Sequence, residues 1–188
     1  QGTSLSRPFQ SAVTIGSGTD DLSDVLLSMV MDINEPIAIG HSVRLEIMNG
    51  TTQIGYIGKK VNGSLGFELG DSGWQNLSNS IGPTNATVGT WHFALHLKSG
   101  NGGTVEATLY GAEADDTTAP ENRLSYPYAV TATLSEAATL DGFRLHRHNN
   151  TTSGIDSIRL MENYATLLVD SDGDNYPDIT DPDDDNDG

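Results

Sequence analysis

Short segments of alternating apolar and polar residues run along most of the chain. In residues 42–48, for example, Val43, Leu45 and Ile47 fall on one face and the intervening polar residues on the other, as expected for a half-buried β-strand. Similar segments predict further strands at residues 25–33, 52–58, 64–69, 89–97, 104–110, 128–133, 140–146 and 154–161. The pattern therefore predicts an all-β chain.

Turn residues separate these segments. Asn49-Gly50 predicts a hairpin between two strands, and Asn101-Gly102-Gly103 predicts a second one. No segment keeps a helical period for more than about two turns. Many short strands at regular spacing predict an antiparallel sandwich or barrel.

Two longer segments favour the sandwich. VGTWHFALHLKSGNGGTVEATLY (88–110) and GIDSIRLMENY (154–164) resemble paired strands and a late strand of concanavalin A-like jelly-roll modules, of the laminin G and lectin type. The resemblance covers roughly residues 10–165. It implies an antiparallel two-sheet β-sandwich, frequent carbohydrate binding and often a structural calcium ion, and it carries over no particular ligand residue.

The composition of the chain limits the kinds of partner and metal site that it could have. The chain has 188 residues, no Cys and a net charge of −17, so disulfides and thiolate metal sites are excluded. Such acidity argues against nucleic acid and anionic membranes as partners, and no apolar run has the length of a membrane span. We expect a secreted or cell-surface bacterial protein.

The segment from residue 170 onward has oxygen ligands at the spacing of an EF-hand-type calcium loop. Positions 1, 3, 5, 7, 9 and 12 of that loop are Asp170, Asp172, Asp174, Tyr176 (through its carbonyl), Asp178 and Asp181. A second register places Asp183, Asp185 and Asp187 at positions 1, 3 and 5. The segment is predicted to bind Ca²⁺; a disordered acidic tail is the alternative.

The ending DPDDDNDG resembles the thrombospondin type 3 repeat in its cysteine-free bacterial form. This implies a calcium-stiffened connector between modules. We therefore expect a sandwich module over 1–168, a truncated calcium-binding linker over 169–188, and further modules of the same polypeptide. The module itself is expected to be a monomer.

Two predicted strands carry His and Arg on the face opposite their apolar residues. His92 and His96 lie opposite Trp91 and Phe93, and Arg144 and His146 are placed in the same way on the strand over 140–146. If the strands are neighbours, this face could line a sugar groove, with Arg144 contacting an acidic sugar. A transition metal at His92/His96 or at His146/His148, or an ordinary solvated sheet face, are the other interpretations.

Aromatic residues in loops are candidates for stacking on sugars. Trp74 lies in a Gly- and Ser-rich loop, and Tyr126 and Tyr128 flank Pro127. The alternative for Trp74 is a ring that folds back as a lid on the core. Trp91 is predicted to be part of the core.

A second calcium site in the sandwich is a further hypothesis. It would use the cluster Asp20, Asp21 and Asp24 with Asp141 or Asp156, or the pair Asp115-Asp116. Solvated turns explain the same residues, because Asp favours turns.

Catalysis has no local motif in the sequence. Glycoside hydrolases need two paired carboxyls, whereas Glu46, Glu68, Glu106 and Asp156 are single acids on different strands. Jelly-roll lyases need an Arg, a His and a Tyr that converge, and no segment unites them. The predicted function is non-catalytic binding of a polysaccharide, such as one from algae or plant cell walls. The alternatives are a cell-surface adhesion or spacer module, and a jelly-roll lyase or hydrolase.

Overall fold

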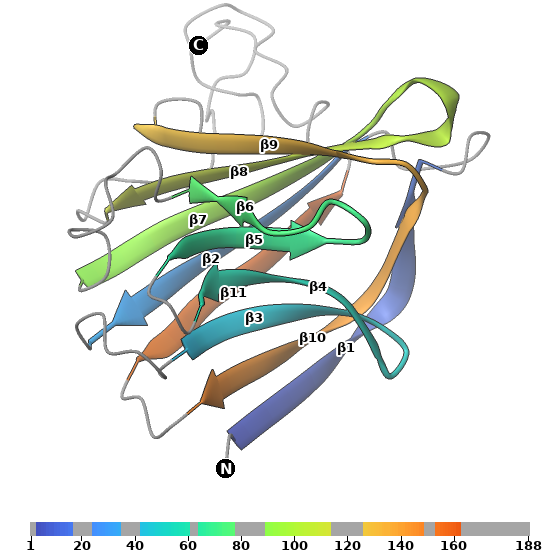
Figure 1. The fold of residues 1–188 in the computed structure, drawn as a ribbon. Helices are drawn as coiled ribbons and strands as arrows, with labels where there is room; N and C mark the ends of the chain where they lie inside the picture. The colour runs from blue at the N-terminus through green and yellow to red at the C-terminus, as the bar shows by residue number, and fades with distance from the viewer. Residues whose placement is uncertain are drawn as a thin grey trace, which may run out of the picture.

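The computed structural model of the chain describes residues 3–16, 24–34, 42–60, 64–77, 89–113, 126–148 and 153–162. These residues form two antiparallel sheets packed face to face (Figure 1). The predicted all-β jelly-roll sandwich is therefore confirmed. None of the described residues belongs to a helix with the length and apolar character of a membrane span.

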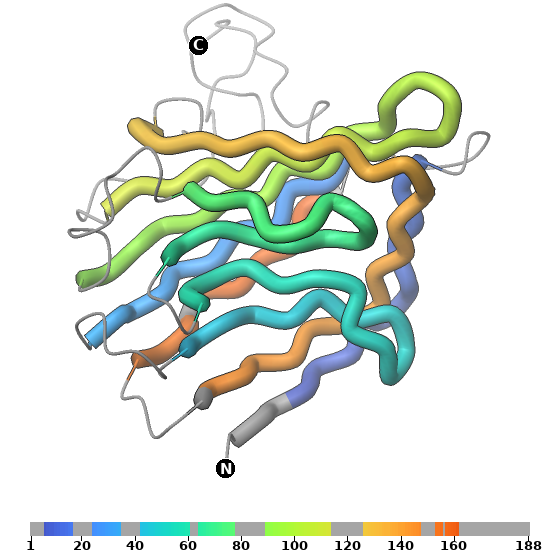
Figure 2. Tube along the Cα trace, in the orientation of Figure 1, coloured from blue at the N-terminus to red at the C-terminus, as the bar shows by residue number. Residues whose placement is uncertain are grey.

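Six strands make the first sheet and five make the second. The first sheet has the order β1 (Thr3–Ile15), β10 (Ala138–His148), β3 (Ser42–Asn49), β4 (Thr52–Lys59), β5 (Leu65–Leu69) and β6 (Gln75–Asn76). The second has the order β11 (Gly154–Glu162), β2 (Asp24–Ile33), β7 (Gly89–Ser99), β8 (Val105–Glu113) and β9 (Tyr128–Leu134). Figure 2 follows the chain from β9 into β10, where it passes from the second sheet to the first at one end of the sandwich.

The nine strands predicted from alternation all exist, and each end lies within three residues of its predicted place. Both predicted hairpins are also present. The turn between β7 and β8 is a short 3-10 segment, Asn101–Gly103, in which Gly102 has φ 71° and Gly103 has φ 81°. A side chain would strain such backbone angles, which explains why glycine stands there. The pattern of the sequence did not predict β1 or the two-residue strand β6.

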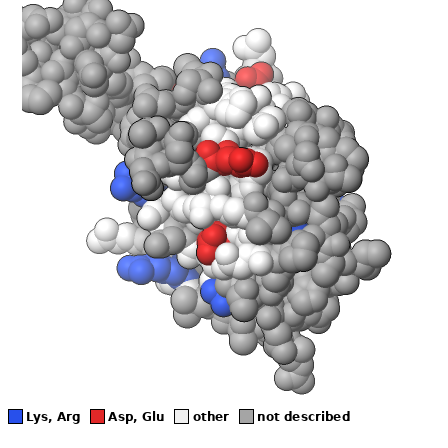
Figure 3. Space-filling view, turned by 90° about the vertical axis from the view of Figure 1, so that its left-hand side faces the viewer, with Lys and Arg blue, Asp and Glu red and all other residues white. Residues whose placement is uncertain are grey.

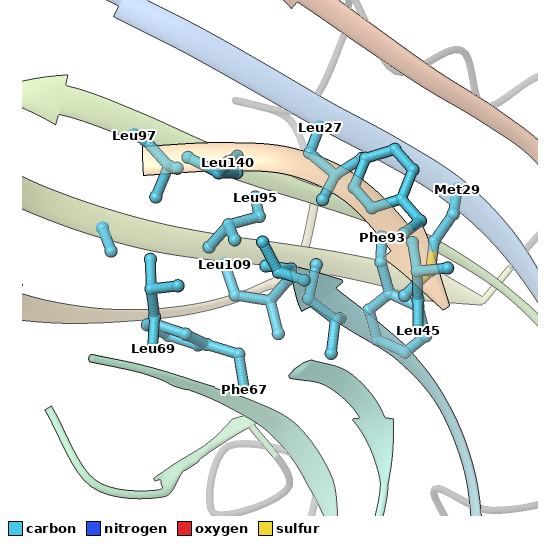
Figure 4. Close-up of a cluster of buried hydrophobic side chains, with 14 of the residues drawn as sticks. Leu27, Met29, Leu45, Phe67, Leu69, Phe93, Leu95, Leu97, Leu109 and Leu140 are labelled. Atoms are coloured by element: carbon cyan, nitrogen blue, oxygen red, sulfur yellow. The ribbon is translucent and has the colours of Figure 1, made fainter. Parts of the chain in front are cut away.

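The core lies between the sheets. Leu45 and Phe67 of the first sheet face Leu27, Leu95 and Leu109 of the second, and all five side chains are fully buried (Figure 4). Burial of each such side chain stabilises the fold by about 1.5–3 kcal/mol. Trp91 is also fully buried, as predicted.

The pleat places the residues next to these core positions on the outer face of the first sheet. Leu145, Leu45, Ile57 and Phe67 pair across four strands, so their neighbours Arg144, Glu46, Tyr56 and Glu68 also pair in one row, facing outward. On the face seen in Figure 3, the described Asp, Glu, Lys and Arg lie in small groups among uncharged residues.

Candidate functional site

A buried carboxylate holds two arginines on the outer face of the first sheet. The Glu46 side chain is only 1% exposed. Its Oε1 accepts hydrogen bonds from Arg44, at 3.0 Å from Nε and 2.8 Å from Nη2. Its Oε2 accepts a hydrogen bond from Nε of Arg144, and Nδ1 of His146 lies 3.7 Å from Oε1. We call these four residues the arginine cluster.

Strand register brings the cluster together. β3 and β10 are neighbours, with Arg144 opposite Glu46 and His146 opposite Arg44. The four residues therefore occupy adjacent positions on one sheet face, although β3 and β10 are far apart in sequence. Alternation alone could predict the face, but only the pairing of the strands brings these charges into contact.

The cluster presents positive charge to solvent. Arg44, Arg144 and His146 are 27%, 32% and 26% exposed, whereas the carboxylate beneath them is almost fully buried. Each guanidinium has five N–H donors, of which only one or two contact Glu46. The remaining donors suit a planar anion such as a carboxylate, which arginine binds in a bidentate manner.

Tyr56 lies beside the cluster on β4. The Arg44 guanidinium carbon is 4.8 Å from the centre of the Tyr56 ring. The hydroxyl donates a hydrogen bond to Oε2 of Glu68 at 3.0 Å. Burial, and then the hydrogen bond and negative charge of Glu68, raise the pKa of Tyr56 to about 12, although Arg44 opposes the shift. Tyr56 is therefore a protonated donor at neutral pH.

Trp74 extends this surface past Tyr56. The two rings stack with centroids 5.5 Å apart and an interplanar angle of 25°, and Nζ of Lys60 is 4.5 Å from the Trp74 ring. The indole lies close to Gly66: a Cβ there would be 3.0 Å from Cζ2 of Trp74 and 1.9 Å from the Gln75 carbonyl oxygen. Trp74 is thus half-buried on the outer face and is no lid on the core.

His92 and His96 do not join this surface. Both lie on β7, on the outer face of the second sheet, so the sandwich separates them from Arg144 and His146. The predicted shared groove is therefore wrong, because a period of two identifies a strand's faces without identifying its sheet. Nε2 of His96 instead hydrogen-bonds Oδ1 of Asp24.

The two other aromatic candidates also lie away from Trp74. Tyr126 is 7% exposed and packs with Leu26, Ala94 and Ala112, so its ring offers no open platform. The Tyr128 ring is half-buried against the core, 6.0 Å from the Trp91 ring. Of the three predicted stacking residues, only Trp74 lies beside the arginine cluster.

The metal-site predictions find no support among the described residues. There, no group of three or more His, Asp or Glu side chains could hold a metal ion. Asp24 pairs with His96, and Oδ2 of Asp141 accepts a hydrogen bond from Gly50 N at 2.5 Å. The following fall outside the described residues: Asp20, Asp21, Asp115, Asp116, the calcium-loop residues from Asp170 to Asp187, and the side chains of His148 and Asp156.

A separate groove of about 580 Å³ opens between β1 and β11. Its lining is mainly apolar and includes Phe9, Leu145 and Ile158, of which Ile158 is 40% exposed. Arg7 and Ser157 are the polar residues of its lining, against eight apolar ones. The arginine cluster offers the stronger chemistry.

Five residues of this surface were not predicted as site residues: Arg44, Glu46, Tyr56, Lys60 and Glu68. A usable signal existed for two of them. Arg44 and Glu46 alternate with core residues just as Arg144 and His146 do, so both pairs could have been assigned to outward faces. For Tyr56, Lys60 and Glu68 the sequence holds no comparable signal.

Comparison with known proteins gives structural likeness alone. No protein-family model and no curated protein matches the chain. It is similar to "Alginate lyase AlgAT5 from Polysaccharide Lyase family 7", with TM-score 0.49 and 12% identity, over 81% of this chain and 62% of that one. An alginate lyase from Klebsiella pneumoniae gives TM-score 0.42 and 14% identity, over 74% and 60%. The chain thus spans about three fifths of each lyase.

A third similar structure is the CBM2 module of an evolved Dit protein from Lactobacillus casei BL23 phage J-1. It gives TM-score 0.35 and 10% identity, over 86% of this chain and 69% of that one. Two of these three structures are named as lyases, and the prediction that the module is not an enzyme is therefore corrected here. That prediction rested on the lack of a local motif, but catalytic groups on separate strands need none.

Proposed function

We propose that the outer face of the first sheet binds an acidic polysaccharide and cleaves it by β-elimination. The observation that carries this proposal is that an Arg, a His and a Tyr share one sheet face: Arg44, Arg144, His146 and Tyr56 lie on neighbouring strands, and Arg44 lies over the Tyr56 ring. A lyase needs this set of groups, which the sequence alone did not unite.

Charge supports an acidic substrate. The chain as a whole carries −17, yet this surface exposes guanidinium groups above a buried acid. The carboxylate of a uronic acid would bind the donors of Arg44 and Arg144 that Glu46 does not use. A neutral sugar would gain much less from charge-assisted hydrogen bonds.

The chemistry follows from the same groups. His146 would act as the base that removes the proton next to the sugar carboxylate, breaking a C–H bond. The two arginines stabilise the negative charge that develops on the carboxylate. As the C=C bond forms and the glycosidic C–O bond breaks, Tyr56 donates its proton to the leaving oxygen. Its raised pKa keeps that proton in place at neutral pH.

The test is the ultraviolet absorbance of the unsaturated product when the protein is incubated with uronate polymers such as alginate or pectate. We expect His146→Gln and Tyr56→Phe each to lower the rate about 100-fold or more. His92→Gln, the same change on the opposite side of the sandwich, should leave it unchanged. Failure of the folded protein to cleave any acidic polysaccharide would overturn the proposal.

We also propose that residues 170–187 bind Ca²⁺ in a secreted bacterial protein. The support is the spacing of the acids, Asp170, Asp172, Asp174, Asp178 and Asp181, which suits a hard cation with oxygen ligands. Calorimetric titration of chelator-treated protein with Ca²⁺ should give binding that Asp172→Ala with Asp174→Ala weakens. No heat of binding, or no effect of the two changes, would refute this assignment.

A further inference from the structure

We infer that Lys60 selects a second acidic sugar of the same polysaccharide chain, next to the sugar held by the arginine cluster. This inference rests on the proposed function, because it needs an acidic chain on this face. It goes beyond it by assigning a second binding position and the chemistry that this position recognises.

Two cations bracket a pair of stacked rings. Arg44 lies over Tyr56 at 4.8 Å and Lys60 lies over Trp74 at 4.5 Å, while the ring centroids are 5.5 Å apart. That gap is too narrow to admit either cation between the rings. Each cation therefore lies over a different ring of the pair, and we assign the two cations to different sugars of the chain.

Lys60 is held in place without being buried. Its side chain is 34% exposed, and Nζ lies 3.9 Å from Oε2 of Glu68, an ion pair at the sheet surface. Its backbone N donates a hydrogen bond to the Ser64 carbonyl at 2.9 Å, which fixes the end of β4. The ammonium has three donors and keeps access to a carboxylate from solvent.

Trp74 acts here as a positioning residue. Its ring faces are occupied by Tyr56 on one side and Lys60 on the other, so a sugar does not stack on it while both neighbours are in place. A cation over an indole gains about 0.5–1 kcal/mol at an exposed site, which biases Lys60 toward the position beside the arginine cluster. The acidic sugar then contacts Lys60 and not the ring.

The row of groups also gives the polysaccharide a direction. Arg144 and Glu46 belong to β10 and β3, Tyr56 to β4, and Glu68 to β5. Nζ of Lys60 lies beside Glu68 of β5, whereas the arginine cluster lies on β10 and β3, so a chain that contacts both crosses β4, over strand spacings of about 4.8 Å each. Oligosaccharides long enough to fill both positions should bind better than shorter ones.

The experiment compares Lys60→Gln, Lys60→Arg and Lys98→Gln in binding and cleavage of a uronate polymer. Lys98 is an exposed lysine on the second sheet and serves as the matched control. Lys60→Gln should weaken binding and raise KM about 2–5-fold with kcat unchanged, as expected for one partly exposed ion pair. Lys60→Arg should restore binding. When the carboxyl groups of the polymer have been reduced, Lys60→Gln and the unaltered protein should bind it equally.

The two proposals fail in different ways. If the unaltered protein neither binds nor cleaves the polymer, the proposed function itself is overturned. If it does so, and Lys60→Gln behaves like Lys98→Gln, only the role of Lys60 is refuted. A fall in kcat with KM unchanged would also refute it, because the loss would then belong to the catalytic step.

Discussion

The arginine cluster should contribute measurably to stability, and Glu46→Gln is the sharpest way to test it. The substitution keeps the shape of a side chain that is 1% exposed but removes its charge. Gln has one acceptor oxygen where the carboxylate has two, so it cannot satisfy both Arg44, on Oε1, and Arg144, on Oε2. One guanidinium then faces the amide NH₂ group, and the two cations lose their common counter-charge.

The magnitude follows from these contacts. A hydrogen bond to a charged group contributes about 1.5–3 kcal/mol, and the guanidinium that faces the amide NH₂ group loses such a bond. Removing one partner of a fully buried pair costs about 3–5 kcal/mol. The arginines here are 27% and 32% exposed, and water replaces part of the loss. We expect a decrease of about 2 kcal/mol in the free energy of unfolding.

Thermal unfolding followed by circular dichroism would measure this. For a domain of this size, about 2 kcal/mol corresponds to a fall of about 4–8 °C in Tm. Glu106→Gln is the control, because it makes the same chemical change at an exposed position of β8. If the two variants differ by less than about 0.5 kcal/mol, Glu46 does not hold the arginines as the structure indicates.

Four further variants test other parts of the structure. Gly66→Ala should disturb β6 and shift the tryptophan fluorescence, because the new Cβ would meet the Gln75 carbonyl oxygen at 1.9 Å; an unchanged spectrum would contradict this packing. Tyr56 should ionise near pH 12 in an ultraviolet titration, and Glu68→Gln should lower that pKa, since the negative charge is removed and the hydroxyl then donates to a neutral amide oxygen. Because an unfolded Tyr ionises near pH 10, the folded protein loses stability as pH rises between about 10 and 12, and Tyr56→Phe should reduce this loss in urea unfolding. Leu95→Ala, in the centre of the core and fully buried, should cost about 2–5 kcal/mol of unfolding free energy; a cost under about 1 kcal/mol would show that the site is poorly packed.

Most strands could be predicted because the pleat imposes its period on the sequence wherever one face is buried. β1 was not predicted because its alternation of apolar and polar residues is interrupted. Its pairing with β10 shifts register between Pro8 and Val13, and Ser11 and Ala12 in this stretch are exposed. Pro also lacks the backbone N–H that a ladder needs, which makes it typical of edge strands. Alternation is weak where no face is consistently buried.

The site could be predicted only in part. Arg144 and His146 were assigned to an outward face from alternation, and they do lie there. Glu46 was taken for an isolated acid, since its bond to Arg144 joins residues 98 positions apart. The choice of neighbouring strand is a property of the whole fold, and a single sequence carries no direct signal for it.

The order of the strands has a consequence for how this chain folds. β1 pairs with β10, and β2 pairs with β11, so each sheet is completed by strands that lie near opposite ends of the described chain. The hairpins β3–β4 and β7–β8 can form while the protein is still being synthesised, and β2 can then pair with β7. The other edge of β2 must wait for residues 154–162 to emerge from the ribosome. Contacts of such long range make folding slow. During that delay this edge of β2 is open to pairing with other chains, and this is the stage at which we expect aggregation.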